Sequence, residues 1–255
     1  MTADDHVLAR DLAEAAGRLL LELRARGGDP DVLRKAGDRL SHEFLVAELN
    51  ARRPHDAVLS EEGIDDKARL SADRVWIVDP LDGTREFGEE GRTDWAVHVA
   101  LWERDSGGLT AGAVALPAQG TVLSTANPPN GPSDEAQPPG KPLKLVVSRS
   151  RAPQLVYDVA GLIDAVLVPC GSAGAKVATV ITGQTDAYLH AGGFYEWDTA
   201  APVAVAADAG FHVSRIDGSD VRYNRDNPLL PDILVCRPAI AGLLLAAIRE
   251  ATHAI

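Results

Sequence analysis

The stretch VWIVDPLDGT, residues 75–84, constrains this chain more than any other part of its sequence. The stretch opens with bulky residues that favour a β-strand, and Pro80 cannot donate to a strand ladder, so we expect a strand that ends at Asp79. A turn then presents Asp79, the carbonyl of Leu81 and Asp82 as closely spaced hard oxygen ligands. Such a ligand set suits Mg²⁺ better than Zn²⁺. A plain Asp-Gly turn is the alternative interpretation of the same residues.

The residues on either side of this turn add an anion site and a further acid. Gly83 lets a ligand approach the backbone, and if the chain opens a helix at Thr84, the N–H groups of its first turn would bind a phosphate. Upstream, a strand predicted over residues 57–60 delivers Glu61 to the neighbourhood of the two aspartates. The pair Glu61-Glu62 is otherwise typical of a solvated loop edge.

The charge of the chain restricts its partners. With 25 basic and 37 acidic residues, the formal net charge is −12, which argues against binding to nucleic acid or to an anionic membrane. A small phosphorylated substrate would also be repelled unless metal ions reversed the local sign of the charge. An acidic start without an apolar run, the lack of any long apolar segment and the wide separation of Cys170 and Cys236 predict a cytoplasmic protein with reduced thiols.

Hydrophobic spacing predicts a layered α/β or α+β protein, in which strands and helices mix throughout. Helices are expected over residues 4–26 and from about Asp38, where Asp38 itself is interpreted as an N-cap. We divide the chain into an N-terminal α+β half that carries the metal motifs, a Pro/Gly-rich loop, and a C-terminal α/β half that completes the active site; these are residues 1–125, 126–142 and 143–255.

Two segments of the C-terminal half bring further candidate residues. The small residues from Gly171 to Lys176 could open a helix and leave N–H groups and the Ser172 hydroxyl for an anion, although tight helix packing explains them equally well. Asp198 precedes an apolar helix expected over residues 203–209, where it is a candidate N-cap as well as a ligand. Pro202 would be tolerated only in the first turn of that helix.

Four acids are expected to share one site. Glu61, Asp79, Asp82 and Asp198 would sum to a charge of about −4, which cannot persist at close range without cations. Two or three Mg²⁺ ions would neutralise these acids and could activate a water and stabilise a leaving oxygen. Other chemistries lack their motifs, because the chain has no His-Glu-x-x-His spacing, no Gly-x-Ser-x-Gly elbow, no Walker loop and no Gly-x-Gly-x-x-Gly fingerprint.

Three motifs in this order, Ser60-Glu61-Glu62, DPLDGT at residues 79–84 and WDTAA at residues 197–201, resemble the inositol monophosphatase superfamily of Mg²⁺-dependent, lithium-sensitive phosphatases. The resemblance implies a layered α-β-α-β-α sandwich. It also implies a first metal held by Glu61, Asp79 and the Leu81 carbonyl, and a second metal held by Asp79, Asp82 and Asp198. The resemblance further implies that Asp38 and Thr84 activate a water, with Glu61 also among the catalytic residues. The N–H groups of Gly83 and Thr84 would bind the phosphate. The Asp38 match replaces its interpretation as an N-cap.

Within the superfamily, the chain most resembles the 3′(2′),5′-bisphosphate nucleotidase branch, through Ser148-Arg149-Ser150, residues 171–176, the segment that ends at Pro202, and Tyr223-Asn224. This branch removes the 3′-phosphate of 3′-phosphoadenosine 5′-phosphate, or of its sulfated form, in sulfate assimilation. The resemblance implies a substrate-binding set of Leu81, Asp82, Gly83, Thr84, Ser148, Arg149, Ser172, Lys176 and Asp198, with Ser172 and Lys176 on the nucleotide.

Two other functions remain open at this point. One is an inositol-phosphate or fructose-bisphosphate phosphatase with the same metal site, and the other is an inactive nucleotide sensor. The complete set of acids argues against a sensor, which would not need a metal site. We expect a small phosphorylated substrate and no nucleic-acid or membrane partner. The sequence does not decide between a monomer and a homodimer.

Overall fold

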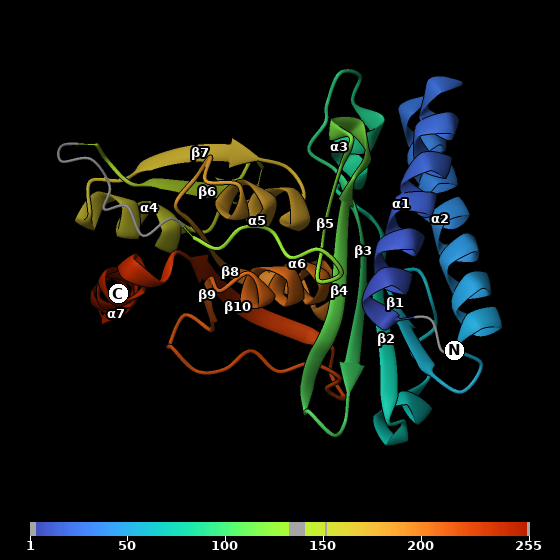
Figure 1. The fold of residues 1–255 in the computed structure, drawn as a ribbon. Coiled ribbons are helices and arrows are strands. Elements are labelled where there is room, and N and C mark those ends of the chain that lie inside the picture. Colours follow the sequence, from blue (N-terminus) through green and yellow to red (C-terminus); the bar gives the residue numbers. More distant parts are fainter. Residues whose placement is uncertain (1–3, 133–140, 151, 254–255) are drawn as a thin grey trace.

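The computed structural model describes residues 4–132, 141–150 and 152–253, which form two five-stranded sheets separated and flanked by helices. Figure 1 shows the resulting order of layers, in which a pair of helices, a sheet, a second pair of helices, a second sheet and a third pair of helices follow one another. The predicted α-β-α-β-α sandwich is therefore confirmed. Part of the Pro/Gly-rich loop, residues 133–140, lies outside the described residues.

The first sheet carries the acidic motifs. Its strand order is β1 (Ala57–Ser60), β2 (Arg74–Asp82), β3 (Ala96–Glu103), β4 (Gly108–Leu116) and β5 (Thr121–Ser124), with β1 parallel to β2 and the other pairs antiparallel. Helices α1 (Asp5–Ala25) and α2 (Pro30–Arg52) cover its outer face (Figure 1). Leu12 and Leu20 of α1 pack with Trp76 and Val78 of β2 in one buried cluster. Strand β2 is buried along almost its whole length, including its end at Asp82.

The second sheet and the inner helices complete the sandwich. The strand order is β7 (Val166–Cys170), β6 (Lys144–Ser148), β8 (Ala187–Tyr195), β10 (Leu229–Cys236) and β9 (His212–Ser214). Helices α4 (Gln154–Leu162) and α7 (Pro238–His253) cover its outer face, and α5 (Ala173–Ile181) and α6 (Glu196–Asp208) lie between the two sheets (Figure 1). A short helix α3 (Thr84–Gly88) follows β2, and single 3₁₀ turns span Lys67–Ser71 and Pro117–Gln119. None of the helices within the described ranges is long and apolar enough to cross a membrane.

Two expected helix boundaries were wrong. Helix α2 begins at Pro30, capped by the side chain of Asp29, so Asp38 lies inside the helix and is not an N-cap. Helix α6 begins at Glu196 and not at residue 203, which places Pro202 in the helix interior. A proline there cannot donate the bond that a helix would give to the carbonyl four residues earlier, which belongs to Asp198.

Strand β2 does not stop at Asp79, as the proline had suggested. It continues to Asp82, and its pairing with β3 shifts between Asp79, opposite His98, and Asp82, opposite Ala96. Pro80 therefore lies in a β-bulge, where a missing N–H costs no regular ladder bond. A bulge changes the direction in which neighbouring side chains point, and this one brings Asp79 and Asp82 to the same cavity.

Candidate active site

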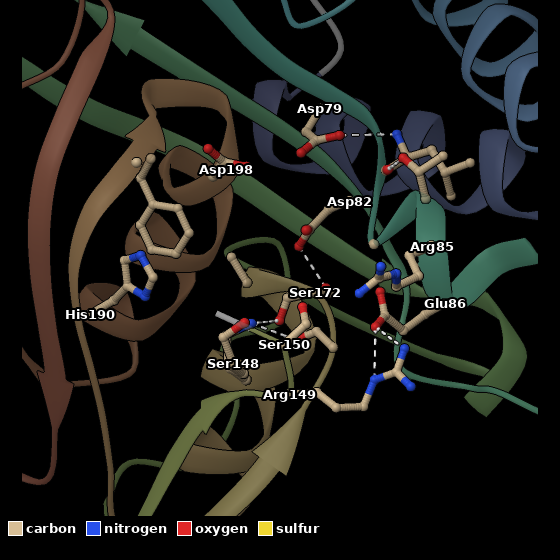
Figure 2. A pocket seen from close by; sticks show the side chains of 18 of the residues that line it. Asp79, Asp82, Arg85, Glu86, Ser148, Arg149, Ser150, Ser172, His190 and Asp198 are labelled. Carbon is tan, nitrogen blue, oxygen red and sulfur yellow. Dashed lines mark hydrogen bonds and ion pairs between the residues drawn. The ribbon is translucent and has the colours of Figure 1, made fainter. Parts of the chain in front are cut away.

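A cavity of about 740 Å³ opens where the end of β2 meets the first turns of α5 and α6. Figure 2 shows acidic, basic and hydroxyl side chains around it, drawn from both halves of the chain. Its charged lining residues are five acids and three bases, Glu61, Asp79, Asp82, Glu86, Asp198, Arg85, Arg149 and Lys176. The lining therefore carries an excess of negative charge before any cation binds.

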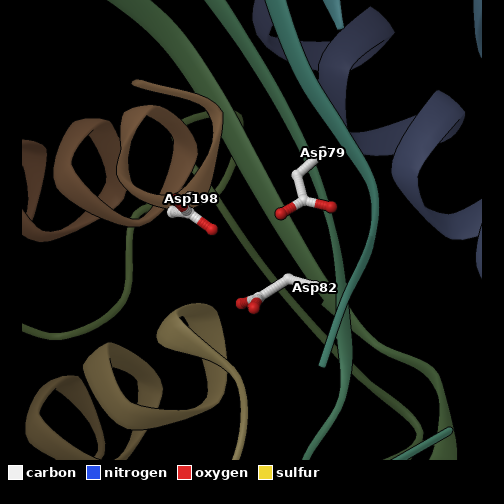
Figure 3. A group of neighbouring side chains, drawn as sticks. All are labelled: Asp79, Asp82 and Asp198. Carbon is white, nitrogen blue, oxygen red and sulfur yellow. The ribbon is translucent and has the colours of Figure 1, made fainter. Parts of the chain in front are cut away.

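Asp79, Asp82 and Asp198 lie at the centre of the site. One carboxylate oxygen from each lies within 4.8 Å of the others (Figure 3), although Asp198 comes from α6 and the other two from β2. The carboxylate of Asp198 accepts a hydrogen bond of 2.6 Å from the backbone N–H of Tyr195, so it caps the helix as well as facing the cavity. Three oxygen donors around one point are typical of a site for a hard divalent cation.

The electrostatics of this cluster also fit a metal ion. Burial and the charge of Asp82 raise the pKa of Asp198 to about 7, and burial and the neighbouring acids raise the pKa of Asp79 well above its usual value. Within the described structure, Oδ2 of Asp79 is buried and has no hydrogen-bond partner. A cation would supply the partner that this oxygen lacks and would return the acids to their ionised forms.

Glu61, the fourth predicted acid, lines the same cavity but lies outside the three-carboxylate cluster. Burial and the charge of Asp198 raise the pKa of Glu61 to about 7, so the Glu61 carboxyl interacts electrostatically with the cluster. The cavity thus collects all four acids, while only three of them share one point.

Asp82 is held differently from the other two aspartates. Its Oδ2 accepts hydrogen bonds from the Ser172 hydroxyl at 2.6 Å and from the Gly174 N–H at 2.7 Å, and His98 Nε2 lies 3.2 Å away. Burial alone would raise the pKa of Asp82, but His98, Lys176 and Ser172 lower it to about 2. A Cβ at Gly174 would lie 2.1 Å from His98 Nε2, so glycine is required there. Asp82 is therefore an ionised carboxylate fixed to the N-terminus of α5.

Lys176 lines the cavity, but its ammonium group is bonded to the loop that precedes α5. Its ammonium group donates to the carbonyls of Gly171 and Ser172, at 2.5 and 2.7 Å, and only 4% of the residue is exposed. The nucleotide contact that the resemblance implied for Lys176 is therefore not supported by this geometry. The Ser172 hydroxyl is likewise taken up by Asp82. Both side chains instead hold the loop that fixes Asp82.

Asp38 and Thr84 meet as the resemblance implied. The Thr84 hydroxyl lies 3.2 Å from Asp38 Oδ1 and 3.0 Å from the carbonyl oxygen of Leu81. Burial raises the pKa of Asp38 to about 6, with a contribution from the charge of Glu62. A carboxylate with a pKa near neutrality is suited to accept a proton. Gly83, at the turn before Thr84, has a φ of +86° and approaches the backbone of Asp94 and Trp95, which explains why a residue without a side chain occupies it.

The remaining predicted residues lie on the wall formed by α3 and the end of β6. Ser148 and Arg149 line the cavity, and Arg149 is bound by Glu86 at 2.9 Å and by Glu89 at 2.8 Å. Two further residues of the site were not predicted: Arg85, which also lines the cavity, and His98, whose Nε2 lies 3.2 Å from Asp82. Arg85 directly follows Thr84, so the DPLDGT motif, extended by one residue, would have included it.

The raised carboxyl pKa values predict how pH affects the metal-free protein. Unfolded aspartates have a pKa near 4, while burial and the charge of Asp82 raise the pKa of folded Asp198 to about 7, so the native state binds more protons between these values and loses stability as the pH rises from about 4 to about 7. We expect the melting temperature of the metal-free protein to fall by more than about 4 °C between pH 5 and 8. Mg²⁺ should raise it more at pH 8 than at pH 5, because protons compete with the ion at pH 5.

Melting temperatures of Asp198→Asn and Asp208→Asn, measured by calorimetry at several pH values, isolate the contribution of Asp198 to this pH dependence. Asp208 lies at the other end of α6 and is exposed, so its variant should retain the wild-type pH dependence. The Asp198 variant should lose part of it. An equal dependence in both variants would assign the effect to the net charge of the chain.

Known proteins are similar to this chain over nearly its whole length. A family model described as the inositol monophosphatase family matches residues 11–253. A Mycobacterium leprae (strain TN) protein named 3′-phosphoadenosine 5′-phosphate phosphatase is 50% identical over 255 residues, which cover 96% of this chain and 94% of that protein. The 3′(2′),5′-bisphosphate nucleotidase CysQ of Escherichia coli (strain K12) is 30% identical over 243 residues, 88% of this chain and 96% of that protein.

Solved structures agree with the sequence comparisons. The crystal structure of CysQ from Bacteroides thetaiotaomicron, described as a bacterial member of the inositol monophosphatase family, superimposes with a TM-score of 0.78 at 28% identity. The alignment covers 91% of this chain and 97% of that one. The similarity therefore extends over both sheets and all layers of the sandwich.

Proposed function

This chain belongs to the inositol monophosphatase family, whose members are metal-dependent phosphatases, and from that premise we propose that it removes the 3′-phosphate of 3′-phosphoadenosine 5′-phosphate or of its sulfated form. The reaction would be hydrolysis of a phosphoric monoester in sulfate assimilation. The observation that carries the proposal is the identity of 50% over nearly the whole length of a relative that bears this name. The proposal is also supported by the cluster of Asp79, Asp82 and Asp198 in one cavity, because these three carboxylates could hold the metal ion that such a phosphatase needs.

Mg²⁺ is the metal that we propose for the acidic cluster, since its donors are all hard oxygens. Asp79, Asp82 and Asp198 would hold one ion, and Glu61, Asp79 and the Leu81 carbonyl another. When bound, the ions would supply the positive charge that a phosphate needs in this negative cavity and lower the pKa of a water. We propose that two or three Mg²⁺ ions bind.

The protein groups around this cluster would handle the proton of the attacking water. The Thr84 hydroxyl has a single proton, which it can give to Asp38 while its oxygen accepts a hydrogen bond from a water. As the water oxygen bonds to phosphorus, one proton of the water would pass to the Thr84 oxygen while the Thr84 proton passes to Asp38, whose pKa is about 6. The bond from phosphorus to the 3′ oxygen would break, and that oxygen would take up a proton from solvent. The N–H groups of Gly83 and Thr84 are proposed to bind the phosphate.

A substrate panel tests the proposal. Phosphate release with Mg²⁺ would be measured for 3′-phosphoadenosine 5′-phosphate, inositol 1-phosphate and fructose 1,6-bisphosphate at equal concentrations. We expect the highest kcat/KM for the bisphosphate nucleotide. Preference for either of the other compounds would assign the chain to another activity of the family, and binding of the nucleotide without release of phosphate from any compound would indicate a sensor.

Lithium inhibition follows from membership of the family and has a physical reason. A small monovalent ion at a Mg²⁺ position would leave the acidic cluster short of one positive charge, so turnover should stall. We expect millimolar Li⁺ to reduce the rate of phosphate release severalfold at saturating substrate, with the same concentration of K⁺ as control. Full activity in millimolar Li⁺, with Mg²⁺ still required, would argue against two neighbouring metal positions.

A further inference from the structure

The three basic residues that line the active-site cavity are not equally available to a ligand. The ammonium group of Lys176 is buried and bound to two carbonyls, and the guanidinium of Arg149 is shared between two glutamates. Arg85 is exposed, and in the described ranges its side chain has neither a hydrogen-bond nor an ion-pair partner. The hydrogen bond from Arg149 lowers the pKa of Glu89, and the charge of Arg85 contributes to that shift. No carboxylate or carbonyl of the described residues binds the Arg85 guanidinium, so Arg85 is the lining base that can turn to an incoming anion.

The position of Arg85 separates it from the point where the reacting phosphate would bind. In Figure 2, Arg85 and Glu86 lie on one side of Asp82, and Asp198 lies on the other. Arg85 belongs to α3, next to Thr84, so its backbone is fixed to the catalytic turn while its side chain reaches into the cavity. The cavity volume of about 740 Å³ leaves room for a ligand that extends from the aspartates to this wall.

From these observations we propose that Arg85 binds the second phosphate of the substrate, the one that is not hydrolysed, and so selects bisphosphates over monophosphates. This inference rests on the proposed function and deepens it. The Glu86 carboxylate beside Arg85 is already paired with Arg149, so it does not cancel the charge of Arg85. Arg149 lies on the same wall, but two glutamates already pair with it, so without Arg85 a second phosphate would face the negative excess of the cavity. Arg85 would thus supply the contact to the nucleotide that the resemblance had implied for Lys176.

Two substrates that differ only in the second phosphate test this proposal. For 3′-phosphoadenosine 5′-phosphate, Arg85→Ala should lower kcat/KM by about 10-fold to 100-fold, mostly through KM, as expected for loss of one charge-assisted contact. For adenosine 3′-monophosphate the loss should stay below about threefold. Arg85→Lys should restore part of the preference, because a lysine keeps the charge but not the planar fork of donors. Arg222→Ala, at an exposed arginine outside this cavity, is the matched control.

The outcomes separate this inference from the proposed function. Equal losses on both substrates would place Arg85 at the reacting phosphate, and no loss on either would remove it from the substrate site; both results overturn the inference. If the wild type instead prefers inositol 1-phosphate, the proposed function fails. In that case, the role of Arg85 is tested by the inhibition constant of 3′-phosphoadenosine 5′-phosphate in the hydrolysis of inositol 1-phosphate. An increase of at least tenfold in Arg85→Ala would support the role of Arg85, and an unchanged constant would contradict it.

Discussion

Replacing Asp198 with Asn is expected to lower kcat by a factor on the order of 10² to 10⁴ at saturating substrate, with Mg²⁺ present and the fold intact. The substitution removes one of the three carboxylates that meet within 4.8 Å and so weakens the binding of the cation that they face. The helix should remain capped, because the amide oxygen of Asn can still accept the Tyr195 N–H bond. Asp82→Asn should produce a loss of the same order.

Asp208→Asn provides the control, since it makes the same chemical change in the same helix but outside the cavity. Its kcat should equal that of the wild type. Circular dichroism and melting curves would verify that both variants are folded. Near wild-type turnover in Asp198→Asn at limiting Mg²⁺ would mean that the aspartate cluster is not the metal site.

Thr84→Ala and Asp38→Asn should each reduce kcat by about 10² to 10⁴, and reduce it more than they raise KM. The two side chains are joined by a 3.2 Å hydrogen bond, and their proposed task is to take a proton in the transition state. Steady-state kinetics on the bisphosphate nucleotide would measure both constants. Since the two residues are proposed to act as one unit, the double variant should lose little more than either single variant.

Thr84→Ser is the informative partner of Thr84→Ala, because it keeps the hydroxyl and loses only a methyl group. It should recover most of the lost activity. A change in KM alone in Thr84→Ala or Asp38→Asn would reassign the pair to substrate binding, and no recovery in Thr84→Ser would indicate that the methyl group matters through packing.

The sequence predicted most of the acidic site because three of its groups are close together in the chain. Asp79, Leu81 and Asp82 lie within four residues, whereas Asp198 is contributed by α6. Pro80 was expected to end the strand, but it lies inside β2 at a bulge. The layered sandwich was available only through the resemblance, since hydrophobic spacing alone indicated a mixed protein without its layer order. The confirmed layer order shows that three short motifs carried that information.

Other features depended on tertiary contacts that no local pattern reports. Asp38 is a good N-cap by type, yet the Asp29-Pro30 pair starts the helix earlier and turns Asp38 toward Thr84. A nucleotide contact for Lys176 was implied only by the resemblance to the bisphosphate nucleotidase branch. The ammonium group of Lys176 instead turns back to the carbonyls of Gly171 and Ser172, a direction that the sequence does not encode locally. Arg85 became a candidate only when its neighbours proved to be paired.

The most direct test of the account follows both phosphates of 3′-phosphoadenosine 5′-phosphate by ³¹P nuclear magnetic resonance during turnover by the wild-type protein. With Mg²⁺ present, the account predicts that the 3′-phosphate signal disappears and inorganic phosphate appears in equal amount, while the 5′-phosphate signal remains as that of adenosine 5′-monophosphate. Addition of a chelator should stop the reaction. Loss of the 5′ signal, or turnover that continues without a divalent cation, would contradict the proposed function and its metal site.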